Sequence, residues 1–136
     1  ELLIENEKMK RICVFMNVFN VHINRSPVLG KAERIVYKEG QFLNASLDKA
    51  SDKNERSSLV IKSDHGPRIV VVQIAGLIAR RILSFISLNQ LLSQGERFGL
   101  IRFGSRVDIY MPLNAITQCK VGDKVIAGES ILASLK

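Results

Sequence analysis

Residues 95–111 read GERFGLIRFGSRVDIYM, two strand-like runs that meet at the step Gly104-Ser105. Glycine has no Cβ and lets the backbone bend sharply, so a following serine hydroxyl can reach the preceding carbonyl carbon. Attack by the Ser105 hydroxyl on the Gly104 carbonyl would cut the chain there and convert Ser105 into a pyruvoyl group. Most Gly-Ser steps are ordinary turns, so the rest of the chain must decide what this one does.

Short runs of β-branched and aromatic residues recur along the chain and are typical of strands. The expected strands are residues 11–24 (as one strand or two), 32–38, 59–62, 68–75, 77–86 (where a helix is the alternative), 98–103 and 107–111, followed by a turn and a strand pair within 121–132. In the run 107–111, odd-numbered side chains should point to one face and even-numbered side chains to the other. Residues 41–58 are polar and without strong periodicity, which indicates a functional loop.

These elements predict a single mostly β domain over residues 1–136, a barrel-sandwich-like hybrid of short strands. The 136 residues suffice for one hydrophobic core, and no apolar run approaches the roughly 20 residues of a membrane helix. Cys13 and Cys119 lie far apart in the sequence and have no metal-site spacing, so we expect no metal, no disulfide and a reducing cytoplasm. Cys13 lies in an apolar run and should be a buried thiol.

The net charge of +7 favours anionic partners: a lipid surface, nucleic acid or an acidic substrate. Basic residues are scattered, and only six Phe and two Tyr accompany them. Without a stacking platform, nucleic acid is disfavoured. Attraction to anionic headgroups is worth about 1 kcal/mol per nearby Lys or Arg, which favours a membrane surface. The alternative is that the excess basic residues only form a solvated surface and bind no partner.

Longer motifs stand out in chain order. They are FMNVFNVHINRSP (15–27), FLNA (42–45) with DKA (48–50) and NER (54–56), VQIAGLIARRI (72–82) and GERFGLIRFGSRVD (95–108). In this order, and over nearly the whole chain, they resemble the phosphatidylserine decarboxylase family in its short bacterial form.

The resemblance implies a self-processing proenzyme that is cut between Gly104 and Ser105. Residues 1–104 would belong to the β subunit, and residues 105–136 would form the α subunit, with the two interlocked. Ser105 would become the pyruvoyl cofactor and form a Schiff base with the amine of phosphatidylserine. The products would be phosphatidylethanolamine and carbon dioxide. The family also implies a peripheral position on the cytoplasmic face of the bacterial inner membrane, and a homo-oligomer is left open.

The histidine motif supplies the candidate site residues. His22 is the expected acid/base, since imidazole titrates near neutral pH, although it could instead fill a strand face. The second histidine, His65, lies in a turn and should be a surface residue. Arg25, with Asn24, is expected to bind the substrate, because guanidinium matches phosphate geometry. A plain surface charge is the alternative for Arg25.

The chain departs from the family pattern in two ways. Better-known family members carry a second histidine in the first motif, where this chain has Arg25. The family's Pro-Ala-Asp-Gly-like motif, whose aspartate assists cleavage, and its N-terminal anchor do not occur in these 136 residues. We therefore expect an N-terminally truncated chain that can be unprocessed or inactive. A further family motif is matched by Asn54, Glu55 and Arg56. These residues either form a loop-stabilising ion pair or contact the substrate.

Two rival functions belong to other classes. Residues 121–129 look like half of a biotinyl or lipoyl carrier motif, and Asp48-Lys49-Ala50 resembles the modified-lysine triplet. The polar run that follows Lys49 does not suit the tight hairpin of a carrier, so a shared β architecture is the better explanation. Biotin or lipoate on Lys49 would favour the carrier. The third alternative is an inactive remnant that only binds lipid.

Overall fold

The computed structural model describes residues 8–16, 23–43, 45, 53–64, 66–76, 82–101, 105–126 and 130–135. The elements it gives in these ranges are all β-strands, which confirms the mostly β prediction. They are β1 (Met9–Met16), β2 (Ile23–Arg25), β3 (Gly30–Lys38), β4 (Arg56–Ser63), β5 (Arg68–Ile74), β6 (Ile82–Ser84), β7 (Leu91–Leu92), β8 (Arg97–Ile101), β9 (Ser105–Pro112), β10 (Ile116–Thr117) and β11 (Ala133–Ser134). No helix within the described ranges has the length and apolar character needed to cross a membrane.

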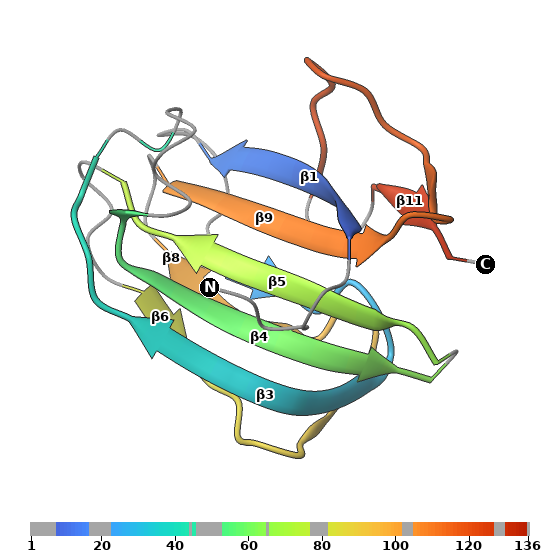
Figure 1. Ribbon diagram of the computed structural model, residues 1–136, viewed down its shortest axis with the longest axis horizontal. Coiled ribbons are helices and arrows are strands. Elements are labelled where there is room, and N and C mark those ends of the chain that lie inside the picture. Colours follow the sequence, from blue (N-terminus) through green and yellow to red (C-terminus); the bar gives the residue numbers. More distant parts are fainter. Residues whose placement is uncertain are drawn as a thin grey trace.

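Two sheets pack face to face (Figure 1). The larger is antiparallel with the order β1-β9-β5-β4-β3-β7, and the smaller has the order β2-β8-β6. The main core cluster combines Ile61 and Val71 of the larger sheet with Phe98 and Ile101 of the smaller one. Two sheets joined by apolar side chains in this way form a sandwich.

The alternation in β9 decides which side chains face the other sheet. Val107, Ile109 and Met111 belong to the core between the sheets, whereas Tyr110 packs against a second cluster on the opposite face. This confirms the predicted alternation. Central strands are buried on both faces and therefore read as continuous apolar runs, as in the valines of β5.

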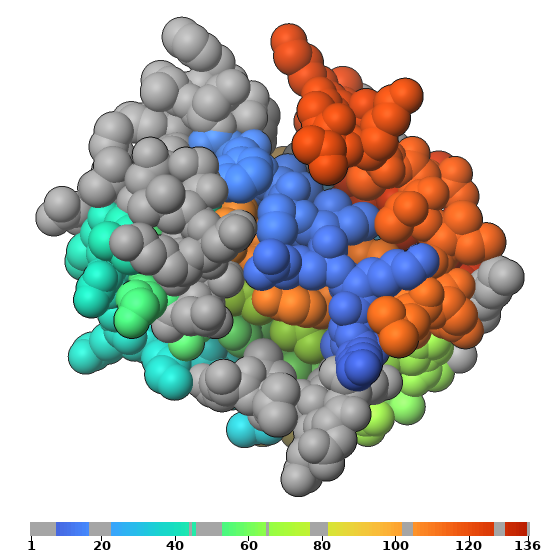
Figure 2. Space-filling view, turned by 45° about the horizontal axis from the view of Figure 1, so that its top comes forward, coloured from blue at the N-terminus to red at the C-terminus, as the bar shows by residue number. Residues whose placement is uncertain are grey.

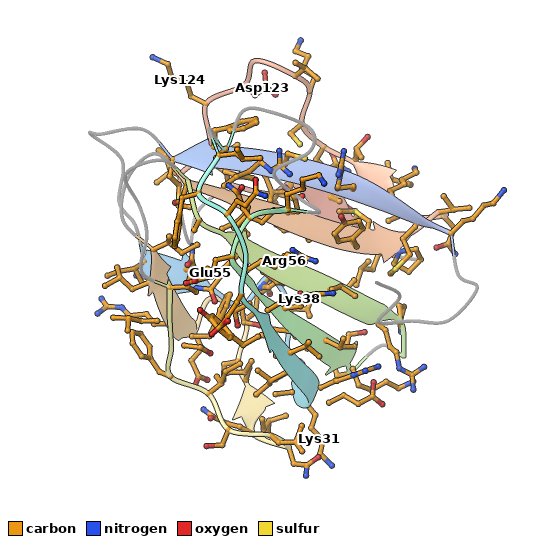
Figure 3. All side chains as sticks on the ribbon, turned by 60° about the vertical axis from the view of Figure 1, so that its left-hand side comes forward. Lys31, Lys38, Glu55, Arg56, Asp123 and Lys124 are labelled. Carbon is orange, nitrogen blue, oxygen red and sulfur yellow. The ribbon has the colours of Figure 1, made fainter. Side chains whose placement is uncertain are left out.

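One end of the sandwich gathers the strand ends next to Ser105, and we call it the Ser105 end. Registered pairs at this end are Met16 with Ser105, Ile74 with Arg106, Arg56 with Ile74, Lys38 with Arg56 and Ile82 with Ile101. Figure 3 shows Lys38, Glu55 and Arg56 together, with Lys31 at the other end of β3. Residues far apart in the sequence are thus brought to the same end of the molecule.

Three expectations need correction. The strand pair expected in residues 121–132 is instead β10 with β11, which flank that segment, although Val121 and Gly122 do form the expected turn. That turn is closed by Asp123, which accepts a hydrogen bond from the Lys120 amide at 2.9 Å.

The other two corrections concern β9 and β1. Strand β9 begins at Ser105 rather than at residue 107, because Ser105 still pairs with Met16. Cys13 is only half-buried, since β1 is an edge strand of the larger sheet. Figure 2 shows β1 in blue at the centre of one face, beside orange C-terminal residues.

Candidate active site

Ser105 is buried, with an exposed fraction of 1%. It is the first residue of β9 and lies directly opposite Met16 of β1. Because side chains alternate along a strand, Ser105 shares the face of Val107 and points between the two sheets. Gly104, the other half of the predicted cleavage step, lies outside the described residues.

A buried amide pair lies beside this strand end. Gln73 Nε2 donates hydrogen bonds to Asn24 Oδ1 at 2.8 Å and to the Leu83 carbonyl at 3.3 Å. Asn24 Nδ2 in turn donates to Met16 Sδ at 3.9 Å, a long contact to a weak acceptor. The pairing fixes the orientation of the Asn24 amide and directs its N–H groups to the residue opposite Ser105. Asn24 was expected in the site, whereas Gln73 was not.

Gly99 makes room for this amide pair. A Cβ at this position would lie 2.5 Å from Gln73 Nε2 and 2.6 Å from the Leu83 carbonyl oxygen. Gly99→Ala should therefore lower the free energy of unfolding by about 1–3 kcal/mol, the usual range for an overpacked core. Urea unfolding measures the change. Ser84→Ala, at the exposed residue that pairs with Gly99, is the control, and equal stability of the two variants would contradict the prediction.

Arg25 lies farther from Ser105 than its neighbour Asn24. Its Nη1 donates to the Gly95 carbonyl at 2.9 Å, and Arg25 pairs with Arg97 at the start of β8. Residues 102–104 follow the other end of β8. The guanidinium of Arg25 is therefore hydrogen-bonded at the Gly95 turn and is not seen in contact with Ser105. Its role at the lipid phosphate stays a prediction.

Asn54 holds three backbone groups at the Ser105 end. It is fully buried, accepts from the Leu43 amide at 2.9 Å, and donates to the Leu43 and Ala75 carbonyls at 2.8 and 2.6 Å. Arg56 Nη1 donates to the Asn54 carbonyl at 3.0 Å. Of the two roles left open for this motif, the contacts of Asn54 support loop stabilisation, and they act through amide hydrogen bonds.

Glu55 interacts with Tyr37 on β3. Its hydrogen bond with the phenol raises the pKa of Tyr37 to about 12. Tyr37 is more than half exposed, so this contact adds little stability.

Asn54→Ala should destabilise the fold strongly. Three backbone groups would lose their partner: the amide and carbonyl of half-buried Leu43 and the carbonyl of buried Ala75. Each unsatisfied buried group costs about 1–3 kcal/mol, and water that reaches the half-buried groups offsets part of this cost. We expect a net loss of about 3 kcal/mol, seen as a lower urea midpoint. Exposed Asn114→Ala is the matched control and should change stability by less than about 0.5 kcal/mol. A midpoint equal to that control would rule out the bracing role.

Arg106 and Asp108 form a buried ion pair on the face of β9 opposite to Ser105. Arg106 Nε lies 2.8 Å from Asp108 Oδ1, and Nη2 donates to Oδ2 at 3.1 Å. The side chains are 2% and 0% exposed. The sequence analysis missed this pair, because the predicted strand began at residue 107, after Arg106. The i, i+2 spacing places both side chains on one face since β9 in fact begins at Ser105.

Comparison with known families decides between the alternatives. The family model described as phosphatidylserine decarboxylase matches residues 1–133 of this 136-residue chain. The chain belongs to the phosphatidylserine decarboxylase family. It is thus an enzyme of the carboxy-lyase class, in phospholipid biosynthesis, and not a biotinyl or lipoyl carrier. No solved structure matches the chain.

Several predicted residues of this decarboxylase lie outside the described ranges: His22, His65, Asp48 and Lys49, as well as Gly104. Within the described ranges, no group of three or more His, Cys, Asp or Glu side chains could hold a metal ion. The geometry on which the site rests is therefore that of Ser105, Asn24 and Gln73.

Proposed function

We propose that this decarboxylase cuts its own chain between Gly104 and Ser105, and that the pyruvoyl group formed at residue 105 serves the decarboxylation of phosphatidylserine. The family match supports the substrate, and the Gly104-Ser105 step supports the cofactor. The observation that carries the proposal is the position of Ser105, buried at the very start of β9 and opposite Met16.

Cleavage follows from the atoms of the two residues. Ser105 Oγ adds to the Gly104 carbonyl carbon, the C–N bond breaks, and the Oγ proton passes to the Ser105 nitrogen, which leaves an ester and a free amine. A base removes the Ser105 α-proton and the Cβ–O bond breaks, which gives a Gly104 carboxylate and dehydroalanine. Water replaces the nitrogen, ammonia leaves, and residue 105 ends as a ketone.

The surroundings of residue 105 fit such a group. A ketone at this position would lie at the first residue of β9, on the face between the two sheets. It would be shielded from bulk water, as Ser105 is. A pyruvoyl group supplies an electron sink for the departing carboxylate. We assign acid/base work to His22, and substrate binding to Asn24 and Arg25. Asn24 has amide N–H groups directed toward the residue opposite Ser105, whereas Arg25 donates through Nη1 to the Gly95 carbonyl.

The substrate is a membrane lipid, and the net charge of +7 suits an anionic bilayer surface. We therefore place the enzyme peripherally on such a membrane, on the cytoplasmic face in a bacterium.

The denatured mass of the purified chain tests the proposal first. We expect two fragments, residues 1–104 and 105–136, with the second lighter by one ammonia than a fragment that starts with serine. Vesicles that contain phosphatidylserine should then yield phosphatidylethanolamine and carbon dioxide. A single intact chain that decarboxylates the lipid would overturn the pyruvoyl proposal.

A further inference from the structure

We propose that the buried Arg106–Asp108 pair is a positioning device for the cleavage junction. It holds the first residues of β9 in the larger sheet, so that Ser105 keeps its place opposite Met16 before and after the chain is cut. This inference rests on the proposed function for its purpose, but the positioning itself can be measured without cleavage.

A contribution to folding stability does not explain why the Arg106–Asp108 pair is buried so deeply. Taking two charges out of water costs several kcal/mol per ion, and apolar replacements of both partners are often neutral or stabilising. The chain offers a comparison on its surface, where Arg68 and Glu33 make contacts of 2.6 and 3.0 Å with side chains 44% and 39% exposed. Such an exposed pair contributes little to stability, because solvent screens it. The buried pair therefore needs another explanation, and fixing local geometry is one.

The contacts of Arg106 and Asp108 cross the junction. Both residues follow Ser105, whereas their further partners precede Gly104. Arg106 Nη1 donates to the Ala45 carbonyl at 3.0 Å, and its guanidinium carbon lies 5.8 Å from the centre of the Phe15 ring. Arg11 Nη1 lies 3.9 Å from Asp108 Oδ2. After a cut at Gly104-Ser105, these contacts would join the two fragments next to the new chain end.

The residues that hold the junction and the residue that is proposed to react lie on opposite faces of β9. Ser105 points between the sheets, and the next residue, Arg106, points to the opposite face, as alternation requires. A newly formed chain terminus frays unless it is tied down. The Arg106 guanidinium binds Asp108 on its own strand and the Ala45 carbonyl on another segment. It thereby holds the new terminus without occupying the face on which Ser105 lies.

Amide hydrogen exchange tests the positioning. The background is Ser105→Ala, which stays in one piece whether or not the parent chain cuts itself. With Arg106→Met and Asp108→Leu added, we expect exchange at residues 105–107 to rise tenfold or more while residues 109–111 keep their protection. Arg68→Met with Glu33→Gln is the matched control and should leave both regions unchanged. Unchanged exchange at residues 105–107 would overturn the proposal.

Arg106→Lys keeps the charge but lacks the fork, and it provides a second, milder variant. It should raise exchange at residues 105–107 less than the double replacement does. If both variants instead lost global stability in urea, the pair would be a brace of the whole fold and the proposal would be wrong.

In the chain with Ser105 intact, the double replacement should slow cleavage at least tenfold. An uncut parent chain combined with altered exchange would refute the proposed cleavage alone. A parent chain that cuts, combined with unaltered exchange, would refute the positioning alone.

Discussion

Ser105→Ala is expected to remain a single chain and to lose phosphatidylserine decarboxylation completely. In the proposed mechanism, the variant lacks the Oγ that would attack Gly104 and the Cβ–O bond whose cleavage would give the ketone, so neither the cut nor the cofactor can form. Denatured mass should show one species, and vesicles that contain phosphatidylserine should yield no phosphatidylethanolamine. Because no other atom of residue 105 can replace this oxygen, we expect a complete loss of cleavage and decarboxylation and not a partial decrease.

The fold should survive this substitution. Ser105 and alanine differ by one oxygen, and a single buried hydrogen bond is worth about 1 kcal/mol. Urea unfolding should therefore show a cooperative transition close to that of the uncut parent. Exposed Ser93→Ala should cut and turn over normally. Decarboxylation by the Ser105→Ala chain would remove residue 105 from the chemistry.

Local pattern was enough to predict the strand faces. Side-chain alternation depends only on neighbouring residues, so Val107 and Ile109 could be assigned to one face of β9 and Tyr110 to the other. Strand ends were less predictable, because they depend on partners far away in the sequence. Ser105 belongs to β9 because Met16 lies opposite, and Arg56 belongs to β4 because Ile74 and Lys38 flank it.

The sequence pointed to single candidate residues such as Ser105 and Asn24, but not to the contacts that several residues make together. Gln73 stands inside the apolar run of β5, and a polar residue there is itself a signal, but its partner Asn24 is 49 positions away. Arg106 and Asp108 share a face because β9 extends back to Ser105, beyond the predicted start at residue 107. Their burial could not be predicted either, since it depends on contacts with Phe15 and Ala45 that only the folded chain provides.

The role of Arg25 at a lipid phosphate stays a prediction. Its residue type and motif suit a phosphate, but the direction of a long side chain depends on tertiary contacts. In the structure the guanidinium donates to Gly95, a residue 70 positions away that the motif does not reveal. A guanidinium carries five N–H donors, so the contact with Gly95 does not by itself keep Arg25 from meeting a lipid phosphate.

His22→Ala is the second change for which we expect a large effect. Positioned acid/base groups contribute roughly 100- to 10,000-fold to rate, so cleavage should slow by about that factor and most of the purified chain should remain uncut. The fraction of fragment 105–136, followed by mass over time, measures it. His65→Ala is the matched control, since these are the two histidines of the chain, and it should cut at the parent's rate.

The pH dependence of cutting separates a proton-transfer role from a structural one. If neutral imidazole removes the Ser105 α-proton, the parent's cleavage rate should fall at acidic pH, because protonation of the ring removes the base. In His22→Ala this decline should disappear, because the titrating base is gone, whereas a merely weakened fold would keep it. Normal cleavage and turnover by His22→Ala would exclude His22 from the site and leave the base to be sought among the residues around Ser105.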